Sequence, residues 1–280
     1  MRGRPVRPTV TPAAPPLAVL GADDLAGRLA RAGWAVGGAP TPGGVAVVGG
    51  AVGERAAAAG RAAAAGAHPF VLWPPGVSAA DADALAARAE EAGVEVGVAR
   101  PALARCAAGL GGWAAGLVSL SLVAPASGPP VLSAGGLLGG ALALVLALVG
   151  TGAAGRIDAA AERDGAALLA LAASLRFRSG AFAQVWLQTS AKERTPDEGP
   201  RAALYASRPG SRVETTDLDR PLVVAGRPAP PADEGAPVDP LVAEVGAFAR
   251  AVVSGRRPAH GLDAALATLR LVERVQGHLR

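Results

Sequence analysis

The stretch Leu17-Ala-Val-Leu-Gly-Ala-Asp-Asp-Leu-Ala26 decides the fold that this sequence predicts. It opens with four apolar residues, continues with Gly21, and then places two acidic residues before the segment 25–32. A short apolar run predicts a strand, a glycine favours a tight turn, and acidic residues are typical of the first turn of a helix. This segment is therefore predicted to form a strand, a turn and a helix.

The same alternation continues downstream as far as residue 99. Further strands are predicted at 34–36, 45–48, 70–73 and 94–99, and helices at 54–65 and 78–92. Ser78-Ala-Ala-Asp81 has the spacing of a capping box, and Gly93 marks the end of that helix. Strands that alternate with helices indicate a parallel sheet with helical crossovers.

A second pattern begins after Pro101. It predicts a helix at 102–110, a strand at 116–123 and an apolar helix at 137–149. Further strands separated by short turns are predicted at 156–161, 167–177, 181–189, 201–206, 211–216 and 221–225. Short turns between strands favour an antiparallel sheet. Two helices with apolar residues at intervals of three and four close the pattern at 240–254 and 262–278.

The predicted fold class is therefore α/β plus α+β. A reduced Rossmann-like parallel-sheet domain at 17–115 precedes an antiparallel-sheet domain with covering helices at 116–238. Residues 239–280 supply the two C-terminal helices, which are expected to pack back on the rest. Residues 1–16, rich in arginine and proline, are expected to be a disordered arm, and the proline-rich stretch 226–240 a linker.

The composition excludes several functional classes. Aromatic residues make up 3% of the chain, which argues against a base-stacking surface for nucleic acid. Lys192 is the single lysine among 27 basic residues, so the pI of 10.4 reflects a small excess of arginine rather than a nucleic-acid partner. One cysteine, Cys106, excludes a disulfide framework, and three widely spaced histidines supply no metal-ligand spacing.

The stretch 106–155 contains no charged residue, so a membrane span is one interpretation of it. Its strongly apolar part, 137–149, is shorter than the ~20 residues that a spanning helix needs, and glycines crowd its start. Prolines interrupt the N-terminal residues, which argues against a signal peptide. We therefore expect a buried helix in a cytoplasmic protein, with a membrane-anchored protein as the alternative.

Several residues match the landmarks of a known family. The family closes on a spaced pattern that includes Glu, Phe, Gly, Pro, Asp, Leu and Glu. The residues of this chain that lie where that pattern puts them are Glu244, Phe248, Ala251, Gly255, Pro258, Gly261, Asp263, Ala264, Leu269 and Glu273. The stretch 78–99 and the glycine pairs at 111–112 and 135–136 match further landmarks. Over residues 17–280 the chain resembles the Gfo/Idh/MocA oxidoreductases, named after glucose–fructose oxidoreductase and inositol dehydrogenase. The resemblance implies a dinucleotide-binding domain and hydride transfer with NAD or NADP.

The chain departs from the family in its cofactor loop. The family's G-x-G-x-x-G/A loop begins at Gly21, and Asp23 replaces the middle glycine, which lets pyrophosphate approach the backbone. Its carboxylate, beside Asp24, would repel phosphate at a helix N-terminus, although Asp23 is also explained as a helix cap. In addition, segment 34–44 has no acidic residue for the ribose hydroxyls, and a helix and a strand of the family's domain are missing there.

The resemblance also assigns catalytic positions, and none of them carries a reactive side chain. The family's Glu-Lys-Pro motif corresponds to Trp73-Pro74-Pro75, which puts Pro74 at the lysine position. The family's His-x-x-Asp pair falls approximately on Ala143 and Leu146, so that helix has no group to accept the proton of an alcohol. No catalytic residue and no metal site are therefore expected. The vestigial cofactor-binding positions would be Gly21, Ala22, Asp23, Ala26 and Trp73.

These departures predict an oxidoreductase homologue that has lost catalysis and acts by association, with no cofactor. The partner would be a second copy or an intact paralogue, bound through the antiparallel sheet, with Phe177 and Trp186 near the contact. The alternative is an active dehydrogenase of a sugar or cyclitol-like substrate that uses NAD or NADP in an unconventional site.

Overall fold

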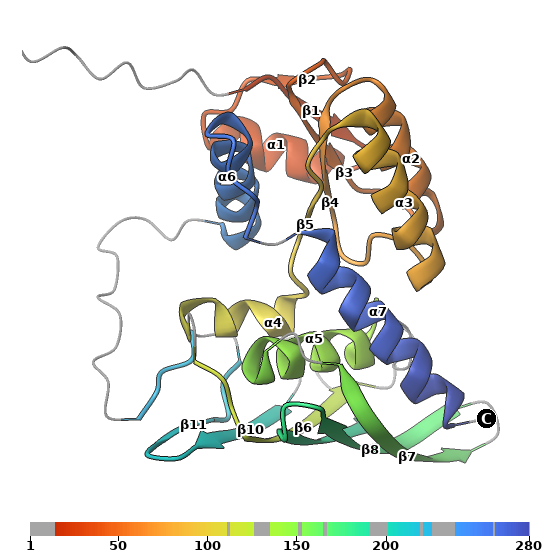
Figure 1. Ribbon diagram of the computed structural model, residues 1–280, viewed down its shortest axis with the longest axis vertical. Helices are drawn as coiled ribbons and strands as arrows, with labels where there is room; N and C mark the ends of the chain where they lie inside the picture. The colour runs from red at the N-terminus through yellow and green to blue at the C-terminus, as the bar shows by residue number, and fades with distance from the viewer. Residues whose placement is uncertain are drawn as a thin grey trace, which may run out of the picture.

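The computed structural model describes residues 15–110, 113–125, 135–150, 153–164, 167–190, 201–218, 221–225, 239–259 and 261–279 of the chain. Figure 1 shows two sheets, one in the upper and one in the lower part of the molecule, with helices beside the first sheet and between the two. Most of the predicted arm and of the predicted linker lie outside the described residues, as do Lys192 and the glycine pair at 111–112.

The N-terminal sheet has five parallel strands in the order β2-β1-β3-β4-β5. They are β1 (Leu17–Leu20), β2 (Val36–Gly37), β3 (Val45–Val48), β4 (His68–Val71) and β5 (Gly97–Val98). A complete Rossmann sheet has the order 3-2-1-4-5-6, so this sheet corresponds to 2-1-4-5-6 and lacks the outermost strand. That strand and its helix would lie between β2 and β3, where the sequence predicts the deletion.

Helices cover both faces of this sheet (Figure 1). On one face lie α1 (Asp23–Arg31) and α6 (Pro240–Val253), and on the other lie α2 (Val52–Ala64) and α3 (Ala79–Ala92). All four residues of β3 are buried, as expected for a central strand covered on both sides. The predicted capping box of α3 is present, because Ser78 and Asp81 each accept a hydrogen bond from the other's backbone N–H.

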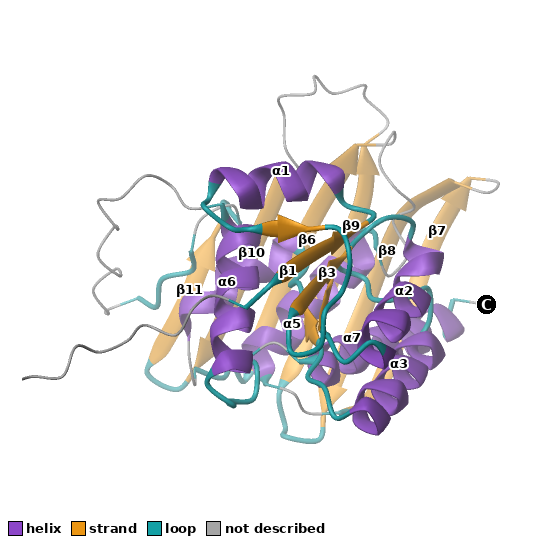
Figure 2. Ribbon diagram, turned by 90° about the horizontal axis from the view of Figure 1, so that it is seen from above, coloured by secondary structure: helices purple, strands orange, loops and turns teal. Residues whose placement is uncertain are grey.

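The second sheet has six strands in the order β11-β10-β6-β9-β8-β7. They are β6 (Leu117–Pro125), β7 (Ala154–Asp164), β8 (Ala167–Phe177), β9 (Phe182–Ser190), β10 (Arg201–Arg208) and β11 (Ser211–Thr215). Four of the five pairings are antiparallel, as predicted, but β6 pairs with β9 in parallel. A helix and a hairpin separate β6 from β9 along the chain, so no short turn forces these two strands to be antiparallel. Figure 2 shows this sheet extending beneath the helices and the smaller parallel sheet.

The sequence predicts a further strand at 221–225, but the structure has no strand there. Leu222 and Val224 are buried in the core, which explains the alternating pattern without a sheet partner. The predicted helix at 102–110 is a short α4 (Ala102–Arg105) that continues as a 3₁₀ helix, Cys106–Leu110. In both places apolar residues contact the core through irregular backbone.

Helix α5 (Leu137–Val149) is buried, as predicted, and covers the inner face of the second sheet (Figure 1). It is apolar on every side because the sheet, α4 and α7 cover it, except at Ala147, which is exposed. A Cβ atom at Gly140 would lie 2.9 Å from the Leu103 side chain, so α4 packs closely against α5 there. Within the described part of the chain, no helix combines the length and the hydropathy that crossing a membrane requires.

Helix α7 (Leu262–Gly277) joins the two halves of the molecule (Figure 1). At its start, Gly261 forms a β-bridge with Gly97 of β5. Near its end, Arg274 Nη1 donates a hydrogen bond of 2.6 Å to the carbonyl of Ala154 in β7. One continuous apolar core therefore runs from α3 through α7 and α5 to the second sheet.

Side chains alternate between the two faces of the second sheet in its central strands β6, β9 and β10. In β9, Val185 and Leu187 are buried, whereas Trp186 between them is 54% exposed on the outer face, which no helix among the described residues covers. Phe177 lies on the buried side, so its predicted position near an outer contact is wrong, because it shares the inward face of β8 with Leu175. The outer face also carries the exposed side chains Leu117 and Tyr205.

Candidate functional site

The loop after β1 lies at the carboxyl edge of the parallel sheet, where the resemblance places the cofactor loop. Gly21 has a φ of +66°, a left-handed conformation that favours glycine, so the predicted tight turn is present. The N-cap of α1 is Ala22, and Asp23 is the first helical residue without a side-chain capping bond. The interpretation of Asp23 as a helix cap is therefore wrong, because a cap residue has to precede the helical turn.

The first turn of α1 presents two exposed carboxylates, those of Asp23 and Asp24. Asp24 pairs with Arg28 one turn further on, at 3.5 Å. Ala26 continues the helix, and its N–H donates to the carbonyl of Ala22 at 3.0 Å. The end of the helix that would face a phosphate therefore carries negative charge.

The loops after β1 and β3 touch at the point where the strand order reverses, which is the usual ligand position in such sheets. A Cβ atom on Gly49 would lie 2.5 Å from the Cβ of Ala22, so glycine is needed for this contact. A hollow of about 410 Å³ lies beside it, lined by Leu20, Gly21, Pro40, Gly49, Gly50, Glu54, Ala58, Arg61, Ala62 and Ala65. Strand β2 ends at Gly37 and Gly38 follows, so no acidic side chain stands at the ribose position.

A second cavity, of about 300 Å³, lies between the carboxyl ends of β4 and β5 and the helices α4, α5 and α7. We name it the junction cavity, and its lining residues are Trp73, Val98, Ala99, Arg100, Pro101, Ala104, Ala107, Leu110, Trp113, Ala143, Leu146, Ala147, Ala259, Gly261, Ala264, Ala265, Ala267 and Thr268. It brings together Trp73, which the resemblance gives as a vestigial cofactor-binding position, and Ala143 and Leu146, the approximate positions of the family's His and Asp. Pro74 does not line it, so Trp73 is the residue of that motif that faces the cavity.

The walls of the junction cavity offer very little polar chemistry. Arg100 supplies the one charged group among the described lining residues. The hydroxyl of Thr268 donates to the carbonyl of Ala264 in its own helix, at 3.0 Å. The indole N–H of Trp113 donates to Ser211 Oγ at 2.9 Å. None of these lining residues has a carboxylate, an imidazole or an amine that would accept a proton.

Arg55 of α2, which the sequence did not single out, holds the loop that carries Trp73. Its guanidinium donates to the carbonyls of Trp73 at 2.7 Å, Pro74 at 3.2 Å and Gly50 at 3.0 Å. Burial lowers the pKa of Arg55 from its ordinary value. This cation binds backbone carbonyls at the ends of β3 and β4, and it fixes the position of Trp73 on the cavity wall.

The similarity of this chain to known proteins lies in its structure, because no protein-family model and no curated protein sequence matches it. The UDP-N-acetylglucosamine 3-dehydrogenase of Acidithiobacillus ferrooxidans is similar with a TM-score of 0.74 at 17% identity, over 95% of this chain and 97% of that one. A probable dehydrogenase from Thermotoga maritima gives 0.69 at 14% identity, over 94% and 96%. An oxidoreductase from Agrobacterium radiobacter, solved with NAD+, L-tartaric acid and magnesium, gives 0.67 at 15% identity, over 95% and 96%.

The chain has the Gfo/Idh/MocA fold. This confirms the expectation from the sequence that a Rossmann-like domain is followed by a separate sheet with covering helices. A shared fold does not carry a shared reaction with it, so the chemistry has to be argued from the residues of this chain.

In this version of the Gfo/Idh/MocA fold, a buried glutamate ties α6 to the end of β5. Glu244 is 8% exposed, and its Oε2 accepts the backbone N–H of Arg100 at 3.0 Å. Its Oε1 lies 3.4 Å from Arg100 Nε and 3.3 Å from Arg105 Nε. Burial lowers the pKa of Arg100, and the Glu244 carboxylate partly opposes that shift. Two guanidinium groups therefore share one carboxylate beside the junction cavity.

Two further residues of the closing pattern make specific contacts. The ring of Phe248 in α6 lies 5.5 Å from that of Phe70 in β4, and Gly97 leaves room for it, since a Cβ there would lie 2.5 Å from Phe248. Glu273 of α7 accepts the N–H of Ala79 at 2.7 Å, at the start of α3. These residues of the Gfo/Idh/MocA pattern hold helices in place.

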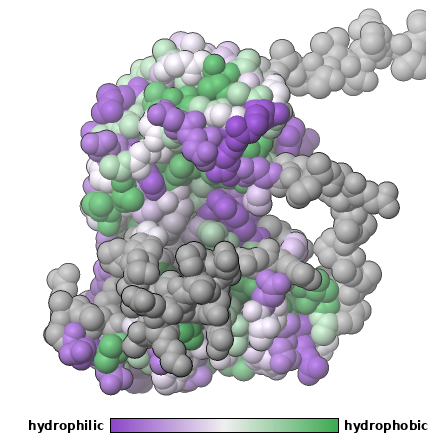
Figure 3. All heavy atoms as spheres, turned by 180° about the vertical axis from the view of Figure 1, so that it is seen from behind, coloured by the Kyte–Doolittle hydropathy of each residue, from purple (hydrophilic) through white to green (hydrophobic). Residues whose placement is uncertain are grey.

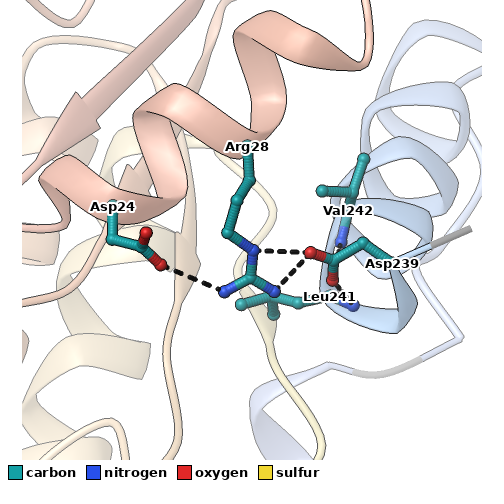
Figure 4. Close-up of polar contacts among 5 residues, drawn as sticks. All are labelled: Asp24, Arg28, Asp239, Leu241 and Val242. Atoms are coloured by element: carbon teal, nitrogen blue, oxygen red, sulfur yellow. Dashed lines mark hydrogen bonds and ion pairs between the residues drawn. The ribbon is translucent and has the colours of Figure 1, made fainter.

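Figure 4 shows the contact that joins α1 to α6. Arg28 of α1 lies between Asp24 and Asp239, and its Nε donates to Asp239 Oδ2 at 2.5 Å. The other carboxylate oxygen of Asp239 accepts the N–H groups of Leu241 at 2.9 Å and Val242 at 3.4 Å, which caps α6. One carboxylate thus caps one helix and binds the side chain of another.

Proposed function

We propose that this chain is a Gfo/Idh/MocA homologue that does not transfer hydride and that acts through association with a second copy or an intact paralogue. The observation that carries the proposal is the junction cavity. Ala143 and Leu146, to which the resemblance approximately assigns the family's His and Asp, line it beside Trp73, and its described lining residues offer no group to accept a proton. Removing hydride from an alcohol needs such a base, so this cavity does not fit the reaction.

The carboxyl edge of the parallel sheet supports the same conclusion for the cofactor. A dinucleotide needs close approach of its pyrophosphate to the loop and an acid at the ribose. Asp23 and Asp24 instead place carboxylates at the helix N-terminus, and Gly37 and Gly38 stand where the acid would follow β2. The residues at this edge therefore do not fit NAD or NADP.

Titration calorimetry with NAD and with NADP tests this part of the proposal. We expect no saturable binding in the low micromolar range with either dinucleotide. The variant Asp23→Gly restores the middle glycine of the loop, and its affinity should exceed that of the native chain. Tight binding by the native chain would contradict the proposal and support an active dehydrogenase.

The outer face of the second sheet supports the association. Trp186 pairs with Ser121 of β6 on one side and with Ala172 of β8 on the other. Because both of these side chains are small, the ring of Trp186 projects beyond its neighbours on the sheet. Tyr205 lies on the same face, paired with Ser119. Exposed large apolar side chains on a sheet face that no described element covers are typical of an interface between chains.

Light scattering after size exclusion measures the association directly. We expect a species larger than the 27.4 kDa chain, and we expect Trp186→Ser to shift it toward that mass. Val77→Ser is the matched control, because Val77 is also exposed but lies in the loop before α3. A native chain that stays monomeric and captures no paralogue would remove the support for association.

The second candidate is an active NAD(P)-dependent dehydrogenase of a sugar or cyclitol-like substrate. The observation that favours it is the glycine turn at Gly21, which has the backbone conformation of a cofactor loop. The similar oxidoreductase from Agrobacterium radiobacter was solved with NAD+. Absorbance of the reduced nicotinamide, followed with a panel of sugars and cyclitols, separates the two candidates.

A further inference from the structure

The junction cavity is open because the helices around it carry very small side chains. Half of its lining residues are alanine, and they come from α4 and the 3₁₀ helix after it, from α5 and α7, and from the segments after β5 and before α7. Trp73 and Trp113 add aromatic walls. An apolar cavity of about 150 Å³ accepts one benzene ring. At about 300 Å³, the junction cavity has room for an apolar body of roughly two rings.

One end of this apolar space carries positive charge. Arg100 lines the junction cavity, and its buried Nε lies 3.4 Å from Glu244 Oε1 in an ion pair, without a well-formed hydrogen bond in the described part of the chain. The nearest opposite charge is Glu244, which Arg105 shares, so two cations meet one anion. An anionic ligand would balance the remaining charge and supply a partner for the guanidinium of Arg100.

The surroundings of Arg100 strengthen this charge. Arg100 also lines a larger hollow of about 1190 Å³ beside α6, together with Arg105, Arg250, Arg256 and Arg257, of which Arg257 is paired with Asp263. Glu244 is the one acidic residue among the described residues that line that hollow. Figure 3 shows hydrophilic side chains gathered over the upper part of the molecule, seen from behind. Anions are therefore attracted toward Arg100, which lines both the larger hollow and the junction cavity.

We propose that the junction cavity binds a small carboxylic acid with an apolar body of about two rings, its carboxylate paired with Arg100. The apolar body lies between Trp73, Ala143 and Leu146, and the carboxylate lies toward the larger hollow. This ligand class differs from the polyols that the fold resemblance implies. The site goes beyond the proposed function, because binding there depends neither on a dinucleotide nor on association.

Calorimetric titration of the full chain with 2-naphthoate tests the proposal. We expect saturable binding with a dissociation constant of about 10–100 μM, as ordinary ligand efficiencies predict for a molecule of this size. Ala143→Phe fills the cavity and should weaken binding at least about tenfold. Ala147→Trp does the same from an exposed position of α5 that puts folding at little risk. Ala87→Phe, on the exposed side of α3, is the matched control and should bind like the native chain.

A second probe isolates the charge. 2-Naphthylmethanol has the same rings without the carboxylate, and we expect it to bind about tenfold more weakly than 2-naphthoate. Arg100→Gln should remove this difference while the affinity for the alcohol stays unchanged. The proposal is overturned if 2-naphthoate does not saturate, if Ala147→Trp binds it like the native chain, or if both probes bind equally well. The dinucleotide titration and the light scattering report on the proposed function separately.

Discussion

Helix α6, which packs on the parallel sheet, and helix α5, which lines the junction cavity, differ in what their side chains do. In α6, Glu244 binds Arg100, and the ring of Phe248 packs on Phe70. In α5, the sequence resemblance assigns the family's His and Asp approximately to Ala143 and Leu146, whose side chains can make no polar contact. The contacts of Glu244 and Phe248 therefore fix the helix in place, whereas Ala143 and Leu146 of α5 offer no reactive group.

This difference shows what the sequence resemblance reports. The residues that carry it, such as Glu244 and Glu273, accept hydrogen bonds from backbone N–H groups and fix helices on the parallel sheet. They indicate how the chain folds, and they say nothing about a reaction. The reaction has to be inferred from the walls of the cavity, where half of the residues are alanine.

The largest effect is expected when the family's acid is placed in α5. Leu146 is 7% exposed, so Leu146→Asp puts a carboxylate into an apolar wall. We expect the free energy of unfolding at pH 7 to fall by about 3 kcal/mol, because a buried charge without a full set of partners is costly. Urea unfolding measures the loss.

The matched control is Leu146→Asn, which has the same shape without the charge. Burial raises the pKa of the introduced carboxyl in the folded state, so its penalty grows as the pH rises above the unfolded value of about 3.9. The gap between the two variants should therefore close below about pH 4. A gap that does not change with pH would mean that the cavity solvates the charge, and the contrast between α5 and the closing helices would weaken.

The next effect concerns the contact of α6 with β5. Gly97→Ala places a Cβ atom 2.5 Å from the Phe248 ring and close to Phe70, so we expect a loss of about 2 kcal/mol from overpacking. Gly53→Ala is the control, because Gly53 in α2 has no atom within 4 Å of the added Cβ and should gain about 0.5 kcal/mol. Equal effects in urea unfolding would show that the Phe248 contact adapts and does not fix α6.

Local sequence patterns predict most of this fold, because strands and helices are set by the spacing of apolar residues. They place α3 with its capping box and α5 as a buried helix. They miss the parallel pairing of β6 with β9, since the partner of a strand across a long connection is not written in the strand itself. They also predict a strand at 221–225 that does not form, because the buried side chains of Leu222 and Val224 alternate as they would in a strand.

The site is less predictable than the fold. The glycine turn at Gly21 is visible because only its backbone matters, whereas the cap of α1 depends on where the helix starts and falls on Ala22. The junction cavity has no sequence signal, because it is the space that alanines from separate helices leave open. The pairing of Arg100 with Glu244 joins residues 144 positions apart, which no local pattern encodes.

A smaller effect is expected when the shared carboxylate is neutralised. Glu244→Gln keeps an acceptor for the backbone N–H of Arg100 but leaves two arginines without their counter-charge. We expect a loss of about 1.5 kcal/mol, less than for a fully buried pair because Arg100 and Arg105 are partly exposed. Glu91→Gln, an exposed glutamate of α3, should change the free energy of unfolding by much less. If both variants unfold alike, Glu244 does not hold α6.

The smallest effect is expected at Asp239, and it depends on pH. Burial acts to raise the pKa of Asp239. Hydrogen bonds from Arg28 and from the N–H groups of Leu241 and Val242 lower the pKa by more than burial raises it, so the net shift is downward. A lowered pKa stabilises the fold fully above the unfolded value of about 3.9, and this contribution is lost as the pH falls through the folded pKa. Asp239→Asn should therefore cost about 1 kcal/mol at neutral pH, and the gap in stability between the variant and the native chain should close below about pH 4.

Asp24→Asn is the control, because Asp24 contacts the other side of Arg28 while its side chain is 85% exposed, and it should show no such gap. Thermal unfolding of the three proteins between neutral and acid pH measures both effects, and a gap that persists in acid would mean that Asp239 acts through packing and not through its charge.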